Sequence, residues 1–233
     1  MIASVHLADV GVRKTLALTR KPPAPGSIPG LRHANVGIAA PLGGSAFPSP
    51  QFGRAALIAF WENDDAIDGF LNDHPLAAKF ASGWHLRLEP LRAYGTWPGL
   101  PREEITDQRN VDRDGPVAAI TMGRPIASQL LRFLRTSSKA EASAVVAPGL
   151  LWTTGIARPP SFVSTCSLWE STRALSTYAY GNRESAHPDA ITSGDAKPFH
   201  HEQAFIRFRP YGAHGHLDGK NALADSLLTS EPA

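Results

Sequence analysis

LRLEP at residues 86–90 is repeated as IRFRP at residues 206–210, and this pair of strings decides the fold. In both strings apolar and polar side chains alternate, which is the period of a strand with one buried and one wet face. We therefore expect one strand at each place, in equivalent positions of two related halves.

Further landmarks recur in the same order on either side of these strings. They are Pro29-Gly30-Leu31 and Pro148-Gly149-Leu150, Gly37-Ile38-Ala39 and Gly155-Ile156-Ala157, Phe60-Trp61-Glu62 and Leu168-Trp169-Glu170, Ala66-Ile67 and Ala174-Leu175, and His74-Pro75 and His187-Pro188. Each match is weak alone, but a shared order is hard to obtain by chance. The order therefore indicates an internal duplication.

Strand-like runs at residues 54–60 and 161–168 each lead to a Trp-Glu pair and then to Asn63 or Ser171. Asparagine and serine are favoured helix N-caps, so a helix should follow each run. Apolar spacing predicts another helix over residues 126–134, after a strand at 117–122, and a less periodic counterpart over 12–20.

Each half then has the order strand, helix, strand, strand, helix, strand. This order predicts an α+β fold of two tandem ferredoxin-like repeats, forming a dimeric α+β barrel-type arrangement. We expect copy 1 at residues 1–97, a linker at 98–116, copy 2 at 117–216 and a disordered C-terminal tail at 217–233.

The composition excludes several classes of protein. No apolar run approaches a membrane span, and the first residues have no secretory signal pattern, so we expect a cytoplasmic protein. The net charge of +2 is not clustered, which argues against nucleic-acid binding. The single cysteine, Cys166, reads as a small buried residue and excludes a multi-cysteine metal site.

His187 stands out among nine histidines. It should end the second helix of copy 2, where Pro188 stops that helix. It is a candidate axial haem ligand, whereas the alternative is a histidine favoured there by the helix dipole.

Several strings resemble the spheroidene monooxygenase (carotenoid ketolase) family. They are GLRHANVGIA, ALIAFWENDDAIDGFLNDHP, LRLEPLRAYGTWPG, TTGIARPPSFVSTCSLWES, YAYGNRESAHPDAI and RFRPYGAHG. The resemblance runs from the first strand to about Gly215. Lys197-Pro198-Phe199 and Gly215-His216-Leu217 depart from the family pattern, which leaves the pocket shape and the substrate open.

The resemblance implies a haem cofactor whose iron is bound by His187, with Tyr178 and Tyr180 beside it. It also implies oxygen-dependent hydroxylation and further oxidation of an apolar polyene to a ketone. Arg207, on the polar face of the last strand, is then a candidate catalytic residue that binds a haem propionate or stabilises bound oxygen. The alternative for Arg207 is an ordinary surface arginine.

The partners follow from this hypothesis. They are a hydrophobic small molecule and, because no dinucleotide fingerprint is present, an external ferredoxin-like electron donor. Peripheral membrane contact for substrate access and a homo-oligomer stay open. The alternative functions are cofactor-free monooxygenase chemistry and a small-molecule-binding barrel without haem.

Overall fold

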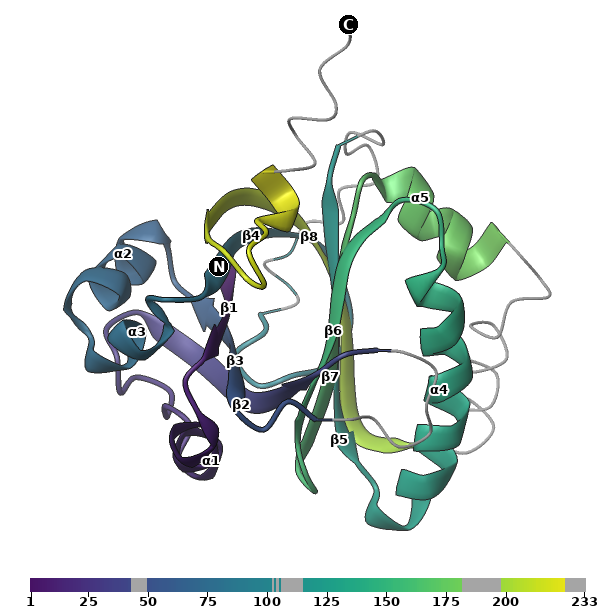
Figure 1. Cartoon of the computed structure of the whole chain (residues 1–233), viewed down its shortest axis with the longest axis horizontal. Coiled ribbons are helices and arrows are strands. Elements are labelled where there is room, and N and C mark those ends of the chain that lie inside the picture. The colour runs from purple at the N-terminus through teal and green to yellow at the C-terminus, as the bar shows by residue number, and fades with distance from the viewer. Residues whose placement is uncertain (43–49, 102, 104, 106–114, 182–197, 225–233) are drawn as a thin grey trace, which may run out of the picture.

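The computed structural model describes residues 1–42, 50–101, 103, 105, 115–181 and 198–224. Antiparallel strands form one closed barrel in the order β1-β3-β2-β6-β7-β5-β8-β4. The helices lie outside this barrel, α1 to α3 on one side and α4 and α5 on the other (Figure 1). The expected combination of antiparallel sheet and covering helices is confirmed.

The N-terminal half contributes the strand order β4-β1-β3-β2. Its elements are β1 (Ile2–Asp9), α1 (Val12–Arg20), β2 (Leu31–Ala40), β3 (Arg54–Trp61), α2 (Asp64–Asp73), α3 (Pro75–Phe80) and β4 (Trp84–Gly95). Both faces of this sheet are covered, which is why β3 is buried at every position.

The C-terminal half contributes the order β8-β5-β7-β6. Its elements are β5 (Val117–Pro125), the 3₁₀ turn η2 (Ala127–Gln129), α4 (Leu130–Val145), β6 (Leu150–Arg158), β7 (Phe162–Trp169), α5 (Thr172–Ser176), the π-helical turn η3 (Thr177–Gly181) and β8 (His200–Gly215). The halves meet where β2 pairs with β6 and β4 pairs with β8. Much of the expected linker lies outside the described residues.

Both expected N-caps are confirmed. Asn63 accepts a hydrogen bond from the backbone N–H of Ala66 at 3.0 Å, and Ser171 accepts one from Ala174 at 3.0 Å. The helix after Ser171 runs only to Ser176 and continues as η3. The part of the expected helix that would reach His187 lies outside the described residues.

The barrel interior is one apolar cluster to which strands of both halves contribute, with Phe60, Trp84 and Phe208 among its largest buried side chains. Cys166 is fully buried in this cluster, and burial raises the pKa of its thiol to about 12. It is therefore a packed thiol, as expected.

The residues after β8 pack against one end of the barrel. Leu223 is buried in the core, and the indole N–H of Trp84 donates to Asn221 Oδ1 at 3.1 Å. The buried guanidinium of Arg54 donates to Asp218 at 2.7 and 2.8 Å and to Asp9 at 2.8 and 2.9 Å. The expectation of a disordered tail from residue 217 is therefore wrong as far as residue 224.

None of the helices in the described ranges combines the length and apolar character that crossing a membrane requires.

Candidate functional site

The outer faces of the two half-barrels differ in how they are covered. Beneath α1, α2 and α3 the N-terminal sheet presents side chains that are at most 4% exposed: Ala34, Val36, Ala55, Leu57, Ala59 and Trp61. Among the described residues this face is therefore covered by a hydrophobic core.

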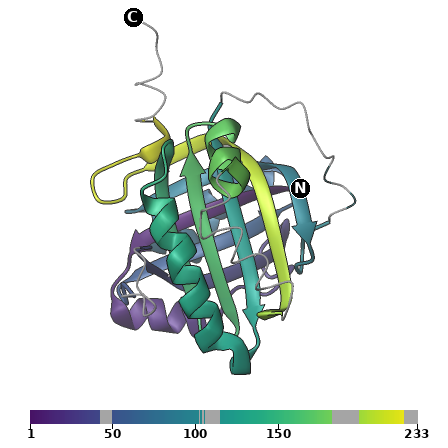
Figure 2. The ribbon, with the colours of Figure 1, turned by 90° about the vertical axis from the view of Figure 1, so that its right-hand side faces the viewer.

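The outer face of β6, β7, β5 and β8 is less completely covered, and we call it the C-terminal face. Its small side chains are only half-buried: Ala119, Thr121, Thr153, Val163, Thr165 and Ser167. Helix α4 crosses the β6 side of this face and α5 lies at one end (Figure 2). No helix of the described part lies over β8, where Phe205 is 45% exposed.

Hydroxyl groups line the middle of the C-terminal face. Thr121 Oγ1 and Thr165 Oγ1 are 2.5 Å apart across β5 and β7, so they share one hydrogen bond. Ser167 Oγ accepts a hydrogen bond from the indole N–H of Trp169 at 2.9 Å. Small and hydroxylated side chains leave a shallow surface that can contact a flat group closely.

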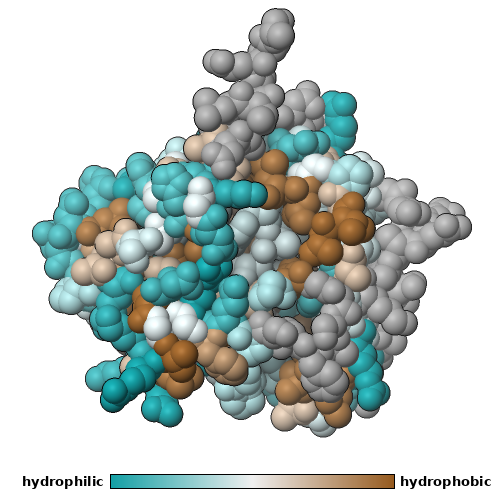
Figure 3. All heavy atoms as spheres, viewed as in Figure 1, coloured by the Kyte–Doolittle hydropathy of each residue, from teal (hydrophilic) through white to brown (hydrophobic). Residues whose placement is uncertain are grey.

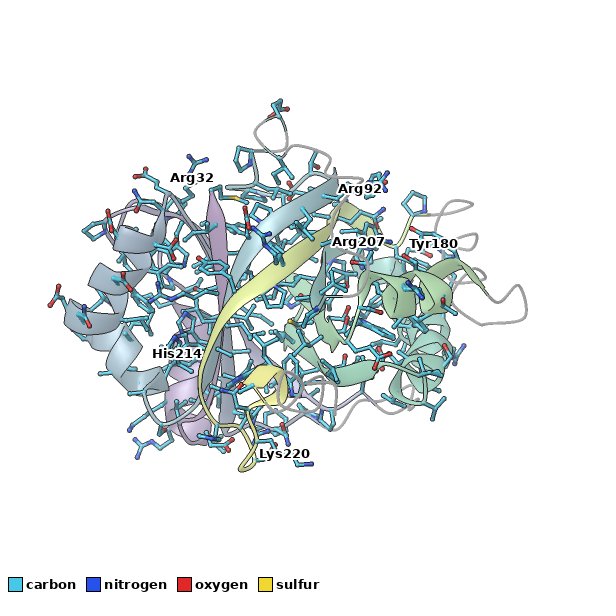
Figure 4. The ribbon with its side chains drawn as sticks, turned by 90° about the horizontal axis from the view of Figure 1, so that it is seen from above. Arg32, Arg92, Tyr180, Arg207, His214 and Lys220 are labelled. Carbon is cyan, nitrogen blue, oxygen red and sulfur yellow. The ribbon has the colours of Figure 1, made fainter. Side chains whose placement is uncertain are left out.

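Arg207 lies in register between Ala119 of β5 and Arg92 of β4. Arg92 in turn stands over the ring of Tyr94, with 4.4 Å from the guanidinium carbon to the ring centroid. Figure 4 shows both arginines on adjacent strands near the end of the sheet where Tyr180 lies. The half-buried side chain of Arg207 has no hydrogen bond or ion pair to another described residue.

Tyr178 and Tyr180 have different surroundings. Tyr178 stacks on Trp169 with ring centroids 5.1 Å apart and 26° between the planes, so it lies against the C-terminal face. Burial is the main cause that raises the pKa of the Tyr178 phenol. A hydrogen bond with Ser143 lowers this pKa and the charge of Glu141 raises it. Both residues belong to α4, so α4 lies beside the phenol. Tyr180 is 67% exposed.

The structure thus brings Tyr178 and Arg207 to one face of one sheet, whereas Tyr180 projects into solvent. His187 lies outside the described residues. Within the described ranges no three His, Cys, Asp or Glu side chains converge so as to hold a metal ion.

Three residues of this site were not found from the sequence. Thr121 and Thr165 lie on one face of the sheet because they alternate with buried neighbours in two predicted strands. This alternation could have identified them as residues of that face. Glu141, whose carboxyl pKa is raised by burial, gave no such signal, because its burial depends on how α4 packs.

Comparison with known proteins relates the chain to one group of enzymes. No family model matches it. A spheroidene monooxygenase from Rubrivivax gelatinosus is 28% identical over 176 residues, which cover 73% of this chain and 66% of that protein. Spheroidene monooxygenase from Rhodobacter capsulatus is 28% identical over 192 residues, covering 80% and 78%. The expected resemblance to the spheroidene monooxygenases is confirmed.

Both of these relatives are named as monooxygenases. The chain spans just under two thirds of the length of the R. gelatinosus relative. Two crystal structures of aldoxime dehydratase, one in complex with butyraldoxime, share the fold with TM-scores of 0.52 and 0.51. They are 9% and 10% identical, and the match covers 96% of this chain and 86% and 84% of theirs, so the likeness concerns the fold alone.

Proposed function

We propose that this protein is a haem-dependent monooxygenase that oxidises an apolar, carotenoid-like substrate at the C-terminal face. The observation that carries the proposal is the contrast between the two outer faces. The N-terminal face is closed by hydrophobic packing, whereas its C-terminal counterpart is half-open and lined by small hydroxylated side chains. The similarity to spheroidene monooxygenases supports oxygenation as the reaction that takes place at the half-open C-terminal face.

The residues of the C-terminal face fit a haem. A flat ring system would contact the half-buried hydroxylated side chains around Thr121 and Thr165. Arg207 has no anionic partner among the described residues, and a carboxylate of the cofactor would supply one. His187, which follows η3 in the sequence, would bind the iron, and Tyr178 would lie beside the cofactor, stacked on Trp169.

The haem, when bound, would supply the binding and reductive activation of oxygen, which no side chain can provide. This chain's own residues hold and deliver protons. Thr121 Oγ1 and Thr165 Oγ1 share a hydrogen-bonded proton, and burial favours the protonated form of the Glu141 carboxyl. The stacked rings of Trp169 and Tyr178 would supply an apolar boundary at one end of the face.

One turnover takes a C–H bond, dioxygen, two electrons and two protons to an alcohol and water. A second oxidation at the same carbon gives a hydrated ketone, which loses water. The electrons come from an external ferredoxin-like reductant, because the chain has no dinucleotide fingerprint. A cytoplasmic location stays a prediction.

An apolar substrate suits the surface around this site. The hydrophobic residues on the face seen in Figure 3 gather on the side of β6 and α5, whereas the surface over α1 to α3 is largely hydrophilic. Val145 and Val146, at the end of α4, are 38% and 78% exposed. A polyene could approach the C-terminal face along this apolar surface.

Substituting His187 tests the proposal. Purified protein titrated with haem should develop a Soret band that His187→Ala loses or shifts, because the axial nitrogen is gone. The control is His201→Ala, which removes an exposed imidazole from β8 and should leave the band unchanged. Absence of haem uptake by the unmodified protein would contradict the proposal and favour cofactor-free chemistry or simple ligand binding.

Arg207→Gln should weaken haem binding by about tenfold, the usual loss when one charge-assisted hydrogen bond to a carboxylate is removed. The matched control is Arg209→Gln, two residues along β8, whose guanidinium is 56% exposed and ion-paired with Glu89. The measurement is the dissociation rate of haem to an apo-globin acceptor. Equal rates for both variants would exclude Arg207 from the cofactor site.

A further inference from the structure

One end of the barrel interior carries polar side chains, in contrast to the apolar core. His33 and Asn35 of β2 are opposite Phe60 and Ile58 of β3, whose side chains face the interior. Arg158 of β6 is likewise opposite the buried Phe162.

The segment after β4 closes this end of the barrel. The backbone N–H of Thr96 donates to Gln203 on β8 at 2.9 Å. On the other side, a Cβ added at Gly99 would lie 2.4 Å from the Cβ of His33, so the segment passes directly over β2. Trp97, between these two contacts, is 5% exposed and packs in the barrel core.

Three buried nitrogen donors at this end have no acceptor within the described part of the chain: Asn35 Nδ2, Trp97 Nε1 and Arg158 Nη1. Asn35 is only 3% exposed. Natural proteins rarely leave buried donors unpaired, and three at one end of the barrel indicate that an acceptor from outside the described residues completes the site.

Two of the three donors share a neighbour, Phe162, and the third, Asn35, lies on β2 beside His33. The ring of Trp97 is 5.7 Å from the ring of Phe162, and the guanidinium carbon of Arg158 is 6.0 Å from the same ring. Burial lowers the pKa of His33 most, a hydrogen bond with the Asn35 side chain raises it, and the charge of Arg158 lowers it.

The charge at this end favours an anion. Arg124 and Glu202 form an ion pair at 3.2 Å and compensate each other. Within the described residues the guanidinium of Arg158 donates to the hydroxyl of Ser161 at 3.3 Å and has no carboxylate partner. Burial and the charge of Arg124 lower the pKa of this guanidinium. Burial lowers the pKa of His33 and favours its neutral imidazole, so among the described side chains named here Arg158 is the cation without a carboxylate partner.

We propose that this end of the barrel binds a small organic monocarboxylate, whose oxygens accept hydrogen bonds from Asn35, Trp97 and Arg158. A carboxylate has two oxygens with about four acceptor positions, enough for three donors. The positive charge of Arg158 matches a monoanion, and the rings of Phe162 and Trp97 offer an apolar wall for the remainder of the molecule. The site lies inside the barrel, across the sheet from the C-terminal face, so it is independent of the proposed function.

The test is a titration of the full chain with sodium benzoate, followed through the indole N–H signals of its tryptophans by ¹H–¹⁵N NMR. Trp97→Phe assigns the Trp97 signal. We expect a saturable shift of that signal, which sodium chloride at equal ionic strength does not reproduce. Arg158→Gln and Asn35→Leu should each weaken benzoate binding by about tenfold or more, while Arg209→Gln should not.

Three results with the unmodified chain and Arg158→Gln would overturn the proposal, and a fourth concerns Asn35→Leu. They are the absence of a saturable shift, the same shift with sodium chloride, and undiminished benzoate affinity in Arg158→Gln. Asn35→Leu distinguishes a binding site from a packing defect. Leucine has nearly the same volume as asparagine but lacks the unpaired amide, so it should preserve the packing and remove the hydrogen bond to benzoate. A variant that is more stable but binds benzoate as tightly as the unmodified chain would count against the site.

Discussion

Replacing Gly83 with alanine is expected to destabilise the fold by about 4 kcal/mol or more, among the larger effects of single substitutions. A Cβ at this position would lie 1.9 Å from the carbonyl oxygen of Leu7 and 2.7 Å from the Cβ of Ala8. Neither atom can move freely, because β1 is paired with β3 on one side and with β4 on the other. The barrel would have to open between β1 and β4.

The measurement is urea unfolding of Gly83→Ala beside Gly69→Ala. Gly69 is exposed within α2, and a Cβ there meets no atom within 4 Å. Alanine at that position should stabilise the protein by up to about 1 kcal/mol, because it restricts the unfolded chain and favours the helix. Equal stability of the two variants would show that β1 and β4 do not pack as closely as described.

Much of the fold could be predicted from the repeated landmarks. Alternation in LRLEP and IRFRP identified β4 and β8, and Asn63 and Ser171 identified the starts of α2 and α5. The pairing of β2 with β6 and of β4 with β8 could not be predicted. Alternation of apolar and polar residues along a strand shows which residues share a face, but it does not show which strand lies next to it. The packing of Leu223 and Asn221 against the barrel could not be predicted either, because a short polar segment shows no regular alternation of apolar and polar residues.

The candidate site was predicted only in part. Arg207 and Tyr178 were identified, and the structure places both on the C-terminal face. The half-open character of that face could not be foreseen, because it depends on how closely α4 approaches the sheet. Asn35 could not be predicted from the sequence, because only the folded structure shows that its amide nitrogen is buried without an acceptor among the described residues.

The stability of this protein should fall steeply on mild acidification because of His6. This imidazole is 1% exposed, and it packs against Phe70 of α2 and Phe80 of α3. Its Nε2 is 2.9 Å from Ser4 Oγ, which accepts the indole N–H of Trp61 at 2.8 Å. The serine hydroxyl is therefore free to donate its proton to a neutral imidazole, and protonation of Nε2 would break that hydrogen bond.

Burial, followed by the positive influence of His85 and Arg87, lowers the pKa of His6 to about 3. In the unfolded chain the pKa is about 6.5, so the unfolded state binds more protons below that pH. The stability is fully present above pH 6.5 and is lost as the pH falls toward 3. Linkage gives a loss of about 2 kcal/mol from His6 alone at pH 5. His85, stacked on His6 at 5.1 Å with its own pKa lowered to about 4, acts in the same direction.

Urea unfolding at pH 7.5, 6 and 5 measures this loss in the unmodified chain and in His6→Gln, where a neutral amide replaces the imidazole. The variant should lose about 2 kcal/mol less than the unmodified chain between pH 7.5 and 5. His201→Gln is the control, because that imidazole is exposed and should leave the pH dependence unchanged. The lowered pKa values of Asp9 and Asp218 affect stability only below about pH 4, so they do not contribute in this range. An identical loss of unfolding free energy in the unmodified chain and in His6→Gln would mean that protonation of His6 is not what destabilises the protein in acid.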